Sequence, residues 1–389
     1  MQLDTESEQA AGAVHSTGTA RAVRIGEGCL GPRAAADAAR VVVVRAPGSS
    51  ANVGPGFDTL GLAVALHLEV TALVPAGAAA QAASRTAADF GADFGADFDI
   101  EVADERGTAR GAEAARNLVV VAAARAAAAG TALPRGLRLR VRSAVPRGRG
   151  LGSSGAAAVA GAALAAAACA LPLSRAAAAA AAAALEGHAD NAAASALGGF
   201  IAAAMPDADG PDRHDGRGRH ALPAITAAPL RLPPAVRIVA AVPRFELATH
   251  VARAALPTAY ARADAVFNVQ RIALLIAALA QDSPDPASVA SAMRDRLHQP
   301  HRAHLVPGLA DVLALDPANV PGLLGVCLSG AGPTAVALAT HNFDDIGTRM
   351  VAAFRAAKGP DGLPVEADYL VLDVDREGVV VDELPPECF

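Results

Sequence analysis

The chain has 389 residues, of which 53% are hydrophobic and only 3% aromatic, and its formal net charge is −6. This length allows two ordinary domains, whose cores must be built mainly from Ala, Val and Leu. The acidic balance argues against a nucleic-acid scaffold, and no run of bulky apolar residues is long enough to cross a bilayer. Lys358 is the only lysine, and it lies in a Gly-Pro turn. A Walker P-loop, a protein-kinase lysine and a pyridoxal Schiff base are therefore excluded, so any phosphate must be bound by backbone amides and arginine.

The two ends of the sequence give weaker information. Residues 1–40 show no clear periodicity, and we expect them to form a disordered extension. They lack the basic start and apolar stretch of a secretory signal. The cysteines at 29, 169, 327 and 388 are scattered, without metal-binding spacing or the density of a disulfide scaffold. These features predict a cytoplasmic protein.

Short strand patterns dominate the next part of the chain. A buried strand is predicted at 41–44, ended by Pro47 and Gly48, and a second at 68–74. Residues 88–98 repeat Ala-Asp-Phe-Gly, which we interpret as a low-complexity loop. Strict alternation at 137–142 indicates a half-exposed strand.

Two Ala-rich helices follow, at 154–170 and from Ser174 to 185, the second with Ser174 as N-cap and Gly187 closing it. A polar loop at 206–223 leads to a strand at 237–242, a helix at 259–280, a strand–turn–strand at 325–339 and a strand pair at 369–381. Strands and helices alternate without the period of a parallel barrel. The order favours an α+β fold with an N-terminal domain at 41–205, a junction at 206–235 and a C-terminal domain at 236–389.

The loop between the strand at 137–142 and the first Ala-rich helix is the strongest candidate for a phosphate site. It comprises Pro146, Arg147, Gly148, Arg149, Gly150, Leu151, Gly152, Ser153 and Ser154. Glycines let the backbone approach a ligand closely, and a helix N-terminus offers free N–H groups and partial positive charge. The loop also satisfies GxGxxG, but a dinucleotide fold needs a ribose-binding acid about 20 residues further on. The first acid is instead Glu186, beyond an almost unbroken Ala-rich stretch.

Three Gly-rich segments together carry a family resemblance. They are the loop above, Ala46-Pro-Gly-Ser-Ser-Ala-Asn52-Val-Gly-Pro-Gly-Phe-Asp58, and Leu328-Ser-Gly-Ala-Gly-Pro-Thr334. In this order they resemble the motifs of the GHMP small-molecule kinases over about residues 41–389. The segment Glu186-Gly-His188-Ala-Asp190-Asn191, with Leu197-Gly-Gly-Phe200, is similar to that of the homoserine kinases, although Ala189 stands where their pattern has Pro.

The resemblance implies a two-domain α+β kinase with its site in the cleft between the domains. It implies transfer of phosphate from ATP, with Mg²⁺, to the side-chain hydroxyl of L-homoserine in threonine biosynthesis. It also implies a homodimer without nucleic-acid or membrane partners. The implied metal ligands are Ser154 and Glu186, and Asn117 is implied beside the nucleotide. Implied substrate-binding residues are Asn52, Asp58, His188, Asn191, Thr249, Arg253 and Arg302, with Asn191, Asp190 and Arg253 as the catalytic set.

The residues leave the proton acceptor and the substrate open. Asp190 either acts as a base or only supports the site, and the amide at Asn191 favours the hypothesis that no strong base is needed. Another GHMP kinase acting on a different alcohol is an alternative, as is a non-catalytic ligand sensor. The intact Ser154 and Glu186 argue against the sensor.

Overall fold

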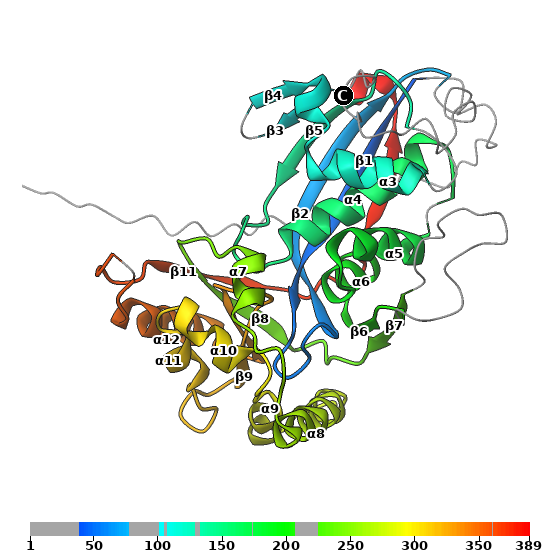
Figure 1. Ribbon diagram of the computed structural model, residues 1–389. Helices are drawn as coiled ribbons and strands as arrows, with labels where there is room; N and C mark the ends of the chain where they lie inside the picture. Colours follow the sequence, from blue (N-terminus) through cyan, green and yellow to red (C-terminus); the bar gives the residue numbers. More distant parts are fainter. Residues whose placement is uncertain are drawn as a thin grey trace, which may run out of the picture.

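The computed structural model describes residues 39–77, 101–104, 107–128, 133–172, 174–206, 225–359 and 361–389. The expected N-terminal extension, apart from its last two residues, and the loop at 88–98 lie outside these ranges. Within them the chain forms two β-sheets, each covered by helices, as expected for an α+β fold (Figure 1). None of the helices in these ranges combines the length and the apolar character needed to span a bilayer.

The first sheet is built around two long antiparallel strands, β1 (Arg40–Ala51) and β2 (Leu60–Val74). Its strand order is β12-β1-β2-β5-β3-β4, and β6 pairs with both β2 and β7. The other bounds are β3 (Glu101–Asp104), β4 (Gly107–Arg110), β5 (Arg138–Ser143), β6 (Phe200–Ala204), β7 (Thr226–Leu230) and β12 (Val380–Leu384). The alternation that predicted β5 is present as an exposed–buried pattern.

Strand β1 does not end at Pro47 and Gly48, which corrects the sequence prediction. The pairing of β1 with β2 shifts register between these two residues and then continues to Ala51. A bulge accommodates a proline in a ladder because the missing N–H falls where the regular bonding is already interrupted. The strand therefore continues into the Ser-Ser-Ala-Asn part of the first motif.

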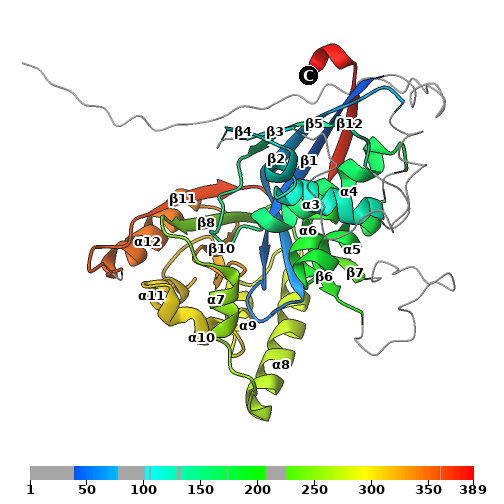
Figure 2. The same ribbon diagram turned by 45° about the horizontal axis from the view of Figure 1, so that its top comes forward.

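Helices cover one face of this sheet, as Figure 2 shows for α3, α4, α5 and α6. Their bounds are α2 (Gly111–Ala114), α3 (Leu118–Ala128), α4 (Ser153–Ala168), α5 (Arg175–Glu186) and α6 (Asp190–Leu197). Helix α4 is almost entirely buried although it contains mainly Ala and Gly. A Cβ at Gly161 would clash with the carbonyl of Val119 on α3. The small side chains thus serve close helix packing in a core with few aromatic residues.

Both predicted caps of α5 are confirmed. The Ser174 hydroxyl accepts a hydrogen bond from the N–H of Ala177 at 3.2 Å, and Gly187 closes the helix with φ 82°. Because Glu186 is the last residue of α5, this C-cap fixes where its carboxylate lies.

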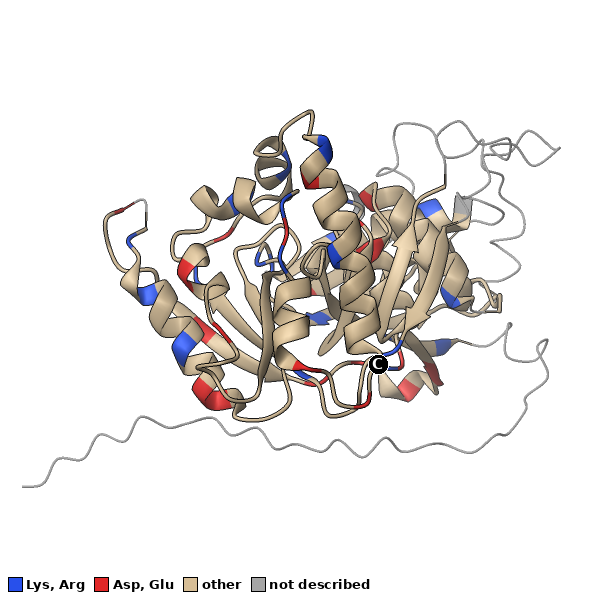
Figure 3. Cartoon of the chain, turned by 90° about the horizontal axis from the view of Figure 1, so that it is seen from below, with Lys and Arg blue, Asp and Glu red and all other residues tan. Residues whose placement is uncertain are grey.

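The second sheet is antiparallel, with strand order β11-β8-β10-β9. Its strands are β8 (Arg237–Pro243), β9 (Leu323–Leu328), β10 (Ala335–Ala339) and β11 (Ala367–Leu372). The accompanying helices are α7 (Thr249–Ala254), α8 (Arg262–Leu279), α9 (Pro286–Ala292), α10 (Gln299–Arg302), η2 (Ala303–Leu305), α11 (Leu309–Leu313) and α12 (Phe343–Ala356), whereas η3 (Pro386–Cys388) follows β12 and contacts β1 of the first sheet. In Figure 3 basic and acidic positions are interspersed along these elements rather than gathered by sign.

The predicted strand pair at 369–381 is wrong, because its two strands lie in different sheets. β11 pairs with β8 in the second sheet, whereas β12 returns to the first sheet and pairs with β1 (Figure 1). The C-terminal segment therefore crosses the expected domain limits, and the other domain bounds stay predictions. A shared apolar cluster also joins the two sheets, with Leu62 and Phe200 from the first and Ile238 and Leu338 from the second.

Candidate active site

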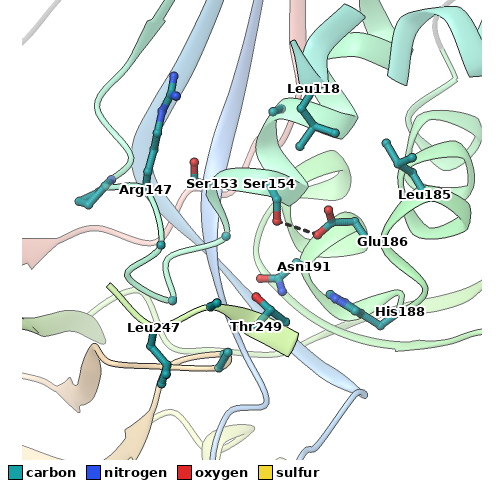
Figure 4. Close-up of a pocket in the computed structure, with 18 of the residues that line it drawn as sticks. Leu118, Arg147, Ser153, Ser154, Leu185, Glu186, His188, Asn191, Leu247 and Thr249 are labelled. Atoms are coloured by element: carbon teal, nitrogen blue, oxygen red, sulfur yellow. Dashed lines mark hydrogen bonds between the residues drawn. The ribbon is translucent and has the colours of Figure 1, made fainter. Parts of the chain in front are cut away.

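One cavity of about 660 Å³ is lined by residues from both sheet units. Seventeen predicted site residues line it: Asn52, Asp58, Asn117, Pro146, Arg147, Gly148, Gly150, Gly152, Ser153, Ser154, Glu186, His188, Asp190, Asn191, Thr249, Arg253 and Arg302. Segments more than 250 residues apart in the sequence therefore converge on one space. Figure 4 shows Ser154, Glu186, His188 and Asn191 around it, with Leu247 and Thr249 on another side.

The loop predicted to bind phosphate forms a tight backbone turn at the start of α4. Gly150 and Gly152 have φ values of 79° and 69°, which L-residues with side chains rarely adopt. A Cβ at Gly150 would clash with the carbonyl of Ser329, and one at Gly152 with the hydroxyl of Ser49. No side chain caps α4 at Gly152. The first N–H groups of α4 therefore lie at the cavity wall with the positive end of the helix dipole.

The third Gly-rich motif holds this loop from the second sheet. The Ser329 hydroxyl donates to the carbonyl of Gly150 at 2.6 Å, and the N–H of Thr334 donates to the carbonyl of Arg149 at 3.2 Å. The N–H of Leu247 donates to the carbonyl of Gly148 at 3.1 Å. The carbonyl oxygens of the loop thus accept hydrogen bonds from the second unit. Oxygens engaged in this way do not point into the cavity, where they would repel an anion bound at the helix amides.

Two residues assigned to nucleotide binding do not line the cavity. The Arg149 guanidinium donates instead to the carbonyl of Pro243, and the Leu151 side chain is fully buried. The carbonyl of Leu151 accepts from the N–H of Ser49 at 3.0 Å. Both residues anchor the loop to its neighbours. The sequence pattern did not distinguish Arg149 and Leu151, which hold the loop in place, from the glycines that line the cavity, because the two kinds of residue alternate along the loop.

Ser154 and Glu186 meet as the metal prediction requires. The Ser154 hydroxyl donates to Glu186 Oε2 at 2.9 Å, across the gap between α4 and the end of α5 (Figure 4). Burial raises the pKa of Glu186, and the Ser154 hydrogen bond opposes that rise only in part. Ser154 and Glu186 together offer two oxygen ligands, and the negative charge of the desolvated carboxylate would be balanced by a cation. This donor set fits a hard divalent cation such as Mg²⁺.

His188, Asp190 and Asn191 form a connected group at the start of α6. Asp190 Oδ1 lies 2.7 Å from His188 Nδ1 and accepts the N–H of Asn191 at 2.7 Å. Burial alone would lower the pKa of His188, but the hydrogen bond and negative charge of Asp190, with Glu186, raise it. The Asp190 side chain therefore binds both neighbours and favours the protonated form of His188.

The first motif is shaped by two residues with unusual backbone angles. Asn52 and Asp58 have φ values of 64° and 49°. The Asn52 amide donates to the carbonyl of Gly330 at 2.9 Å and accepts the N–H of Asp58 at 2.9 Å. Both ends of this amide are used within the protein. Asn52 therefore ties the first motif to the third and positions Asp58, whereas the sequence had assigned it to the substrate.

Asp58 faces a basic partner in this structure. Arg253 donates to both of its carboxylate oxygens, at 2.9 and 3.1 Å. Arg302 is only 2% exposed, and its guanidinium donates to the carbonyls of Ala252 and Gly330 at 3.1 Å each. Burial and then the Arg253 charge lower the pKa of Arg302. Two guanidinium groups and one carboxylate thus gather in one part of the cavity wall.

Comparisons with known proteins agree with this arrangement. The family model "GHMP kinases N terminal domain" matches residues 117–199, which include the phosphate loop and Glu186. Homoserine kinase of Saccharomyces cerevisiae is 33% identical, over 88% of this chain and 99% of its own. The chain belongs to the homoserine kinases of the GHMP kinase family. Homoserine kinase of Moorella thermoacetica is 36% identical, over 82% of this chain and 93% of its own. The crystal structure of homoserine kinase from Cytophaga hutchinsonii aligns with a TM-score of 0.65 and 25% identity, covering 88% of this chain and 97% of that one.

Apart from Leu118, which belongs to the Asn117-Leu118 pair implied beside the nucleotide, the sequence interpretation missed an apolar wall of the cavity in this homoserine kinase family member. Leu68, Leu118, Val119, Val141 and Leu185 line the cavity between β2, β5 and the ends of α3 and α5. Figure 4 shows Leu118 and Leu185 on the same side, beyond Glu186. Each belongs to an ordinary strand or helix pattern, so nothing in the local sequence separates it from a core position. Ser143 of β5 also lines the cavity and was missed for the same reason, and Arg116, in the turn before α3, was missed as well.

Asn117 borders the apolar wall, and its side chain forms a hydrogen bond at the start of α3. Its side-chain oxygen accepts the N–H of Val119 at 3.0 Å at the start of α3. With the oxygen engaged, the amide NH₂ is the group left to face the cavity.

Proposed function

We propose that the protein transfers the γ-phosphoryl group of ATP to the side-chain hydroxyl of L-homoserine, giving O-phospho-L-homoserine. The observation that supports this most directly is the layout of the cavity described above. An anion site at the start of α4 lies between an apolar wall and a cluster of guanidinium and carboxylate groups. A nucleotide, with its base and phosphates, fits the half of the cavity with the apolar wall and the anion site. A small amino acid, with its carboxylate and ammonium groups, fits the half with the charged cluster.

In this proposal the nucleotide base packs on the apolar wall and its phosphates lie over the loop at 148–152. Glycine backbone and the amides of α4 then bind the phosphate oxygens without lysine. Arg147, which lies 3.8 Å from Asp104, is at the rim and adds positive charge near the same loop. Its role is electrostatic, since Gly150 and Gly152 supply the close contacts.

Ser154 and Glu186 are the residues that would hold Mg²⁺ with the phosphates. When bound, the ion neutralises charge on the transferring phosphate. The protein's part is to present the Ser154 hydroxyl and the Glu186 carboxylate 2.9 Å apart at the positive end of α4. Burial raises the pKa of Glu186, so its ionised carboxylate is unfavourable in the absence of a cation and would be stabilised by a bound one.

The amino-acid half of the site binds L-homoserine through opposite charges. Arg253 supplies a planar guanidinium for the substrate carboxylate, and Asp58 supplies a carboxylate for its ammonium group. These two residues form an ion pair with each other in the structure. A zwitterionic substrate can replace that pair with two intermolecular ones, so the charges of the site stay balanced. Arg302, buried behind them, keeps the local potential positive.

In the transfer step the hydroxyl oxygen forms a bond to the γ-phosphorus while the bond to the bridging oxygen of ADP breaks. Holding both reactants in line accounts for most of the catalysis, on the order of 7–11 kcal/mol. We propose that the hydroxyl proton is released to water and that Asp190 does not accept it. The support for this is that Asp190 Oδ1 is already engaged by His188 and the N–H of Asn191. Asn191 and His188 are then the groups that orient the substrate.

An ADP-release assay across four alcohols tests the proposal. Homoserine, mevalonate, galactose and threonine would each be titrated with ATP, with and without Mg²⁺, and the products identified by phosphorus NMR. We expect kcat/KM for homoserine to exceed that for mevalonate and galactose by at least about 100-fold, because mevalonate has no ammonium group for Asp58 and galactose has no charged group for either Asp58 or Arg253. Equal rates with galactose or mevalonate, or no turnover at all, would contradict the proposal. The cytoplasmic location and the homodimer expected from the sequence stay predictions.

A further inference from the structure

A second cavity, of about 390 Å³, shares no lining residue with the first. It lies among the C-terminal end of α9, α10, η2, α11 and β9, on the second sheet unit. Its wall is largely apolar, comprising Ala290, Met293, Pro300, Ala303, Ala310, Leu313, Ala314, Leu315, Gly325 and Val326. Its volume is in the range of about 300–1,000 Å³ that is usual for small-molecule sites.

The remaining wall residues offer hydrogen-bond donors. Gln299 is only 5% exposed, and its Oε1 accepts the N–H of Leu328 at 2.8 Å. Its Nε2 has no hydrogen-bond partner among the residues that the structure describes, although it is not sealed from the cavity. Arg294 also lines the cavity and forms no ion pair within the described ranges. A nearly buried amide thus lines the cavity with a donor to spare, and Arg294, whose guanidinium lies 5.6 Å from the centroid of the Phe267 ring, adds positive charge at the wall.

The one carboxylate in the wall does not offset these donors. The Asp295 side chain is 0% exposed and accepts four hydrogen bonds. They come from the Asn268 amide and from the N–H groups of Leu297, His298 and Gln299, at 2.7 to 2.9 Å. Its acceptor capacity is used inside the protein. Among the described wall residues a cationic ligand would therefore find no free side-chain carboxylate, whereas an anionic one would find the Gln299 amide and the charge of Arg294.

We propose that this cavity is a binding site for a small aliphatic carboxylate. The hydrocarbon part packs against Met293, Leu313 and Val326, and the carboxylate is bound by the Gln299 amide and the Arg294 guanidinium. Such a ligand satisfies the buried donor of Gln299, and its charge is matched by Arg294. The site is separate from the one proposed for ATP and homoserine.

The position of Gln299 gives the site a connection to the phosphate loop. Through Oε1 it holds Leu328 at the end of β9, and the next residue, Ser329, donates to the carbonyl of Gly150. Gln299 and Arg302 also begin and end the same short helix, α10, and Arg302 lines the first cavity. A ligand bound at Gln299 is thus one hydrogen bond away from the strand end that supports the loop.

The test is a binding measurement on the full chain with 4-methylpentanoate as the probe. A non-hydrolysable ATP analogue, Mg²⁺ and homoserine would be present at saturation, so that the first cavity is filled. Calorimetry or saturation-transfer NMR should show one site with a Kd of about 1 mM, as expected for a ligand of this size. The matched amine, 4-methylpentan-1-amine, should not bind. No saturable binding of the acid up to about 10 mM, or equal binding of the amine, would overturn the proposal.

Two variants and a matched control locate the site. Arg294→Ala should weaken the probe about tenfold, and Gln299→Glu, which keeps the acceptor for Leu328 but replaces the free donor, should do so at least as strongly. Arg296→Ala is the control, because Arg296 lies over the same Phe267 ring as Arg294 but does not line the cavity. If Gln299→Glu fails to fold, Arg294→Ala and its control still decide. An equal effect of Arg294→Ala and Arg296→Ala would place the probe elsewhere and refute the site.

Discussion

The hydroxyl of Ser49 donates to the side-chain oxygen of Asn191 at 2.8 Å. Ser49 is fully buried in β1, and Asn191 lies in the first turn of α6 at the cavity. Because this bond occupies the amide oxygen, the Asn191 NH₂ group is the end left to face the cavity. Ser49 is therefore a positioning residue, and the motif that contains it acts on the site through the amide of Asn191.

Ser49→Ala should lower kcat about fivefold to tenfold, the equivalent of one lost hydrogen bond of about 1 kcal/mol, with little change in KM for ATP. The control is Ser195→Ala, which removes another fully buried hydroxyl, bonded to the carbonyl of Pro47 at 2.7 Å. Steady-state kinetics and thermal unfolding would be measured for both variants. If the two lose kcat in equal proportion to their stability, Ser49 has only a structural role.

Asp190→Asn separates a supporting role from that of a general base. Loss of support should reduce kcat by less than about tenfold, whereas loss of a base costs ~10²–10⁴-fold. A loss in the larger range, with the fold intact by circular dichroism, would show that Asp190 accepts the proton. Glu113→Gln, at an exposed carboxylate outside the cavity, should leave kcat unchanged.

The same variant has a pH signature through His188. Asp190 is the main group that raises the pKa of His188 above 6.5 in the folded protein. A raised histidine pKa stabilises the fold fully below the unfolded value, and this contribution is lost as pH rises through the folded value. The stability gap between the wild type and Asp190→Asn should thus be largest below pH 6.5 and shrink above the folded pKa. Denaturant titrations from pH 5.5 to 9 would measure it, and a gap independent of pH would contradict the assignment.

Local structure was largely predictable from the sequence, and pairing was not. The caps Ser174 and Gly187 and the alternation in β5 are signals that depend on a few neighbouring residues, and each is confirmed. The partner of β12 is set by packing some 340 residues away at β1, and an alternating pattern carries no information on its partner. That is why the strand pair at 369–381 was wrong.

The site shows the same division. Ser154 and Glu186 were expected in one site because their motifs occur intact, and the structure brings them within hydrogen-bond distance. The ion pair of Asp58 with Arg253, in contrast, joins residues 195 positions apart. The use of the Asn52 amide as an internal tie likewise depends on the distant carbonyl of Gly330. Motifs thus identified which side chains gather, and only the fold showed which of them bind one another.

Glu186→Gln should weaken Mg²⁺ activation while stabilising the empty fold. The KM for Mg²⁺ should rise by at least about 10–100-fold, because the loss of a residue that only hydrogen-bonds a metal ligand already weakens metal binding by this factor. Burial raises the pKa of Glu186, so the folded state binds its proton more tightly than the unfolded state, and stability falls as pH rises from 4.5 through the folded pKa. The variant avoids this cost, so its Tm without Mg²⁺ at pH 7 should exceed that of the wild type.

The control for this prediction is Glu101→Gln, which removes a carboxylate paired with Arg110 outside the cavity. It should leave the KM for Mg²⁺ unchanged. A Tm for Glu186→Gln below that of the wild type in magnesium-free buffer at pH 7 would contradict the electrostatic interpretation.

Arg253→Ala should raise the KM for homoserine about 10–100-fold, because a charge-assisted contact to a substrate carboxylate is worth about 1.5–3 kcal/mol. The matched control is Arg244→Ala. Arg244 is also an exposed arginine that pairs with carboxylates, Glu366 and Asp368, but it does not line the cavity. An unchanged KM in Arg253→Ala would favour a substrate without a carboxylate, and so another GHMP kinase activity.

Gly150→Ala tests the close approach on which the phosphate site depends. Gly150 has φ 79°, and a Cβ there would clash with the carbonyls of Ser329 and Gly332. Gly362 has the same φ of 79°, but a Cβ there would meet nothing within 4 Å. Gly362→Ala should therefore cost only the conformational strain, about 1 kcal/mol, and leave catalysis unchanged. Gly150→Ala adds displacement of the third motif from the loop, so it should cost more stability and also raise the KM for ATP. Because backbone strain is common to both variants, the difference between them in urea unfolding and in KM for ATP isolates the contact. Equal values would mean that the approach of Gly150 to Ser329 does not shape the phosphate site.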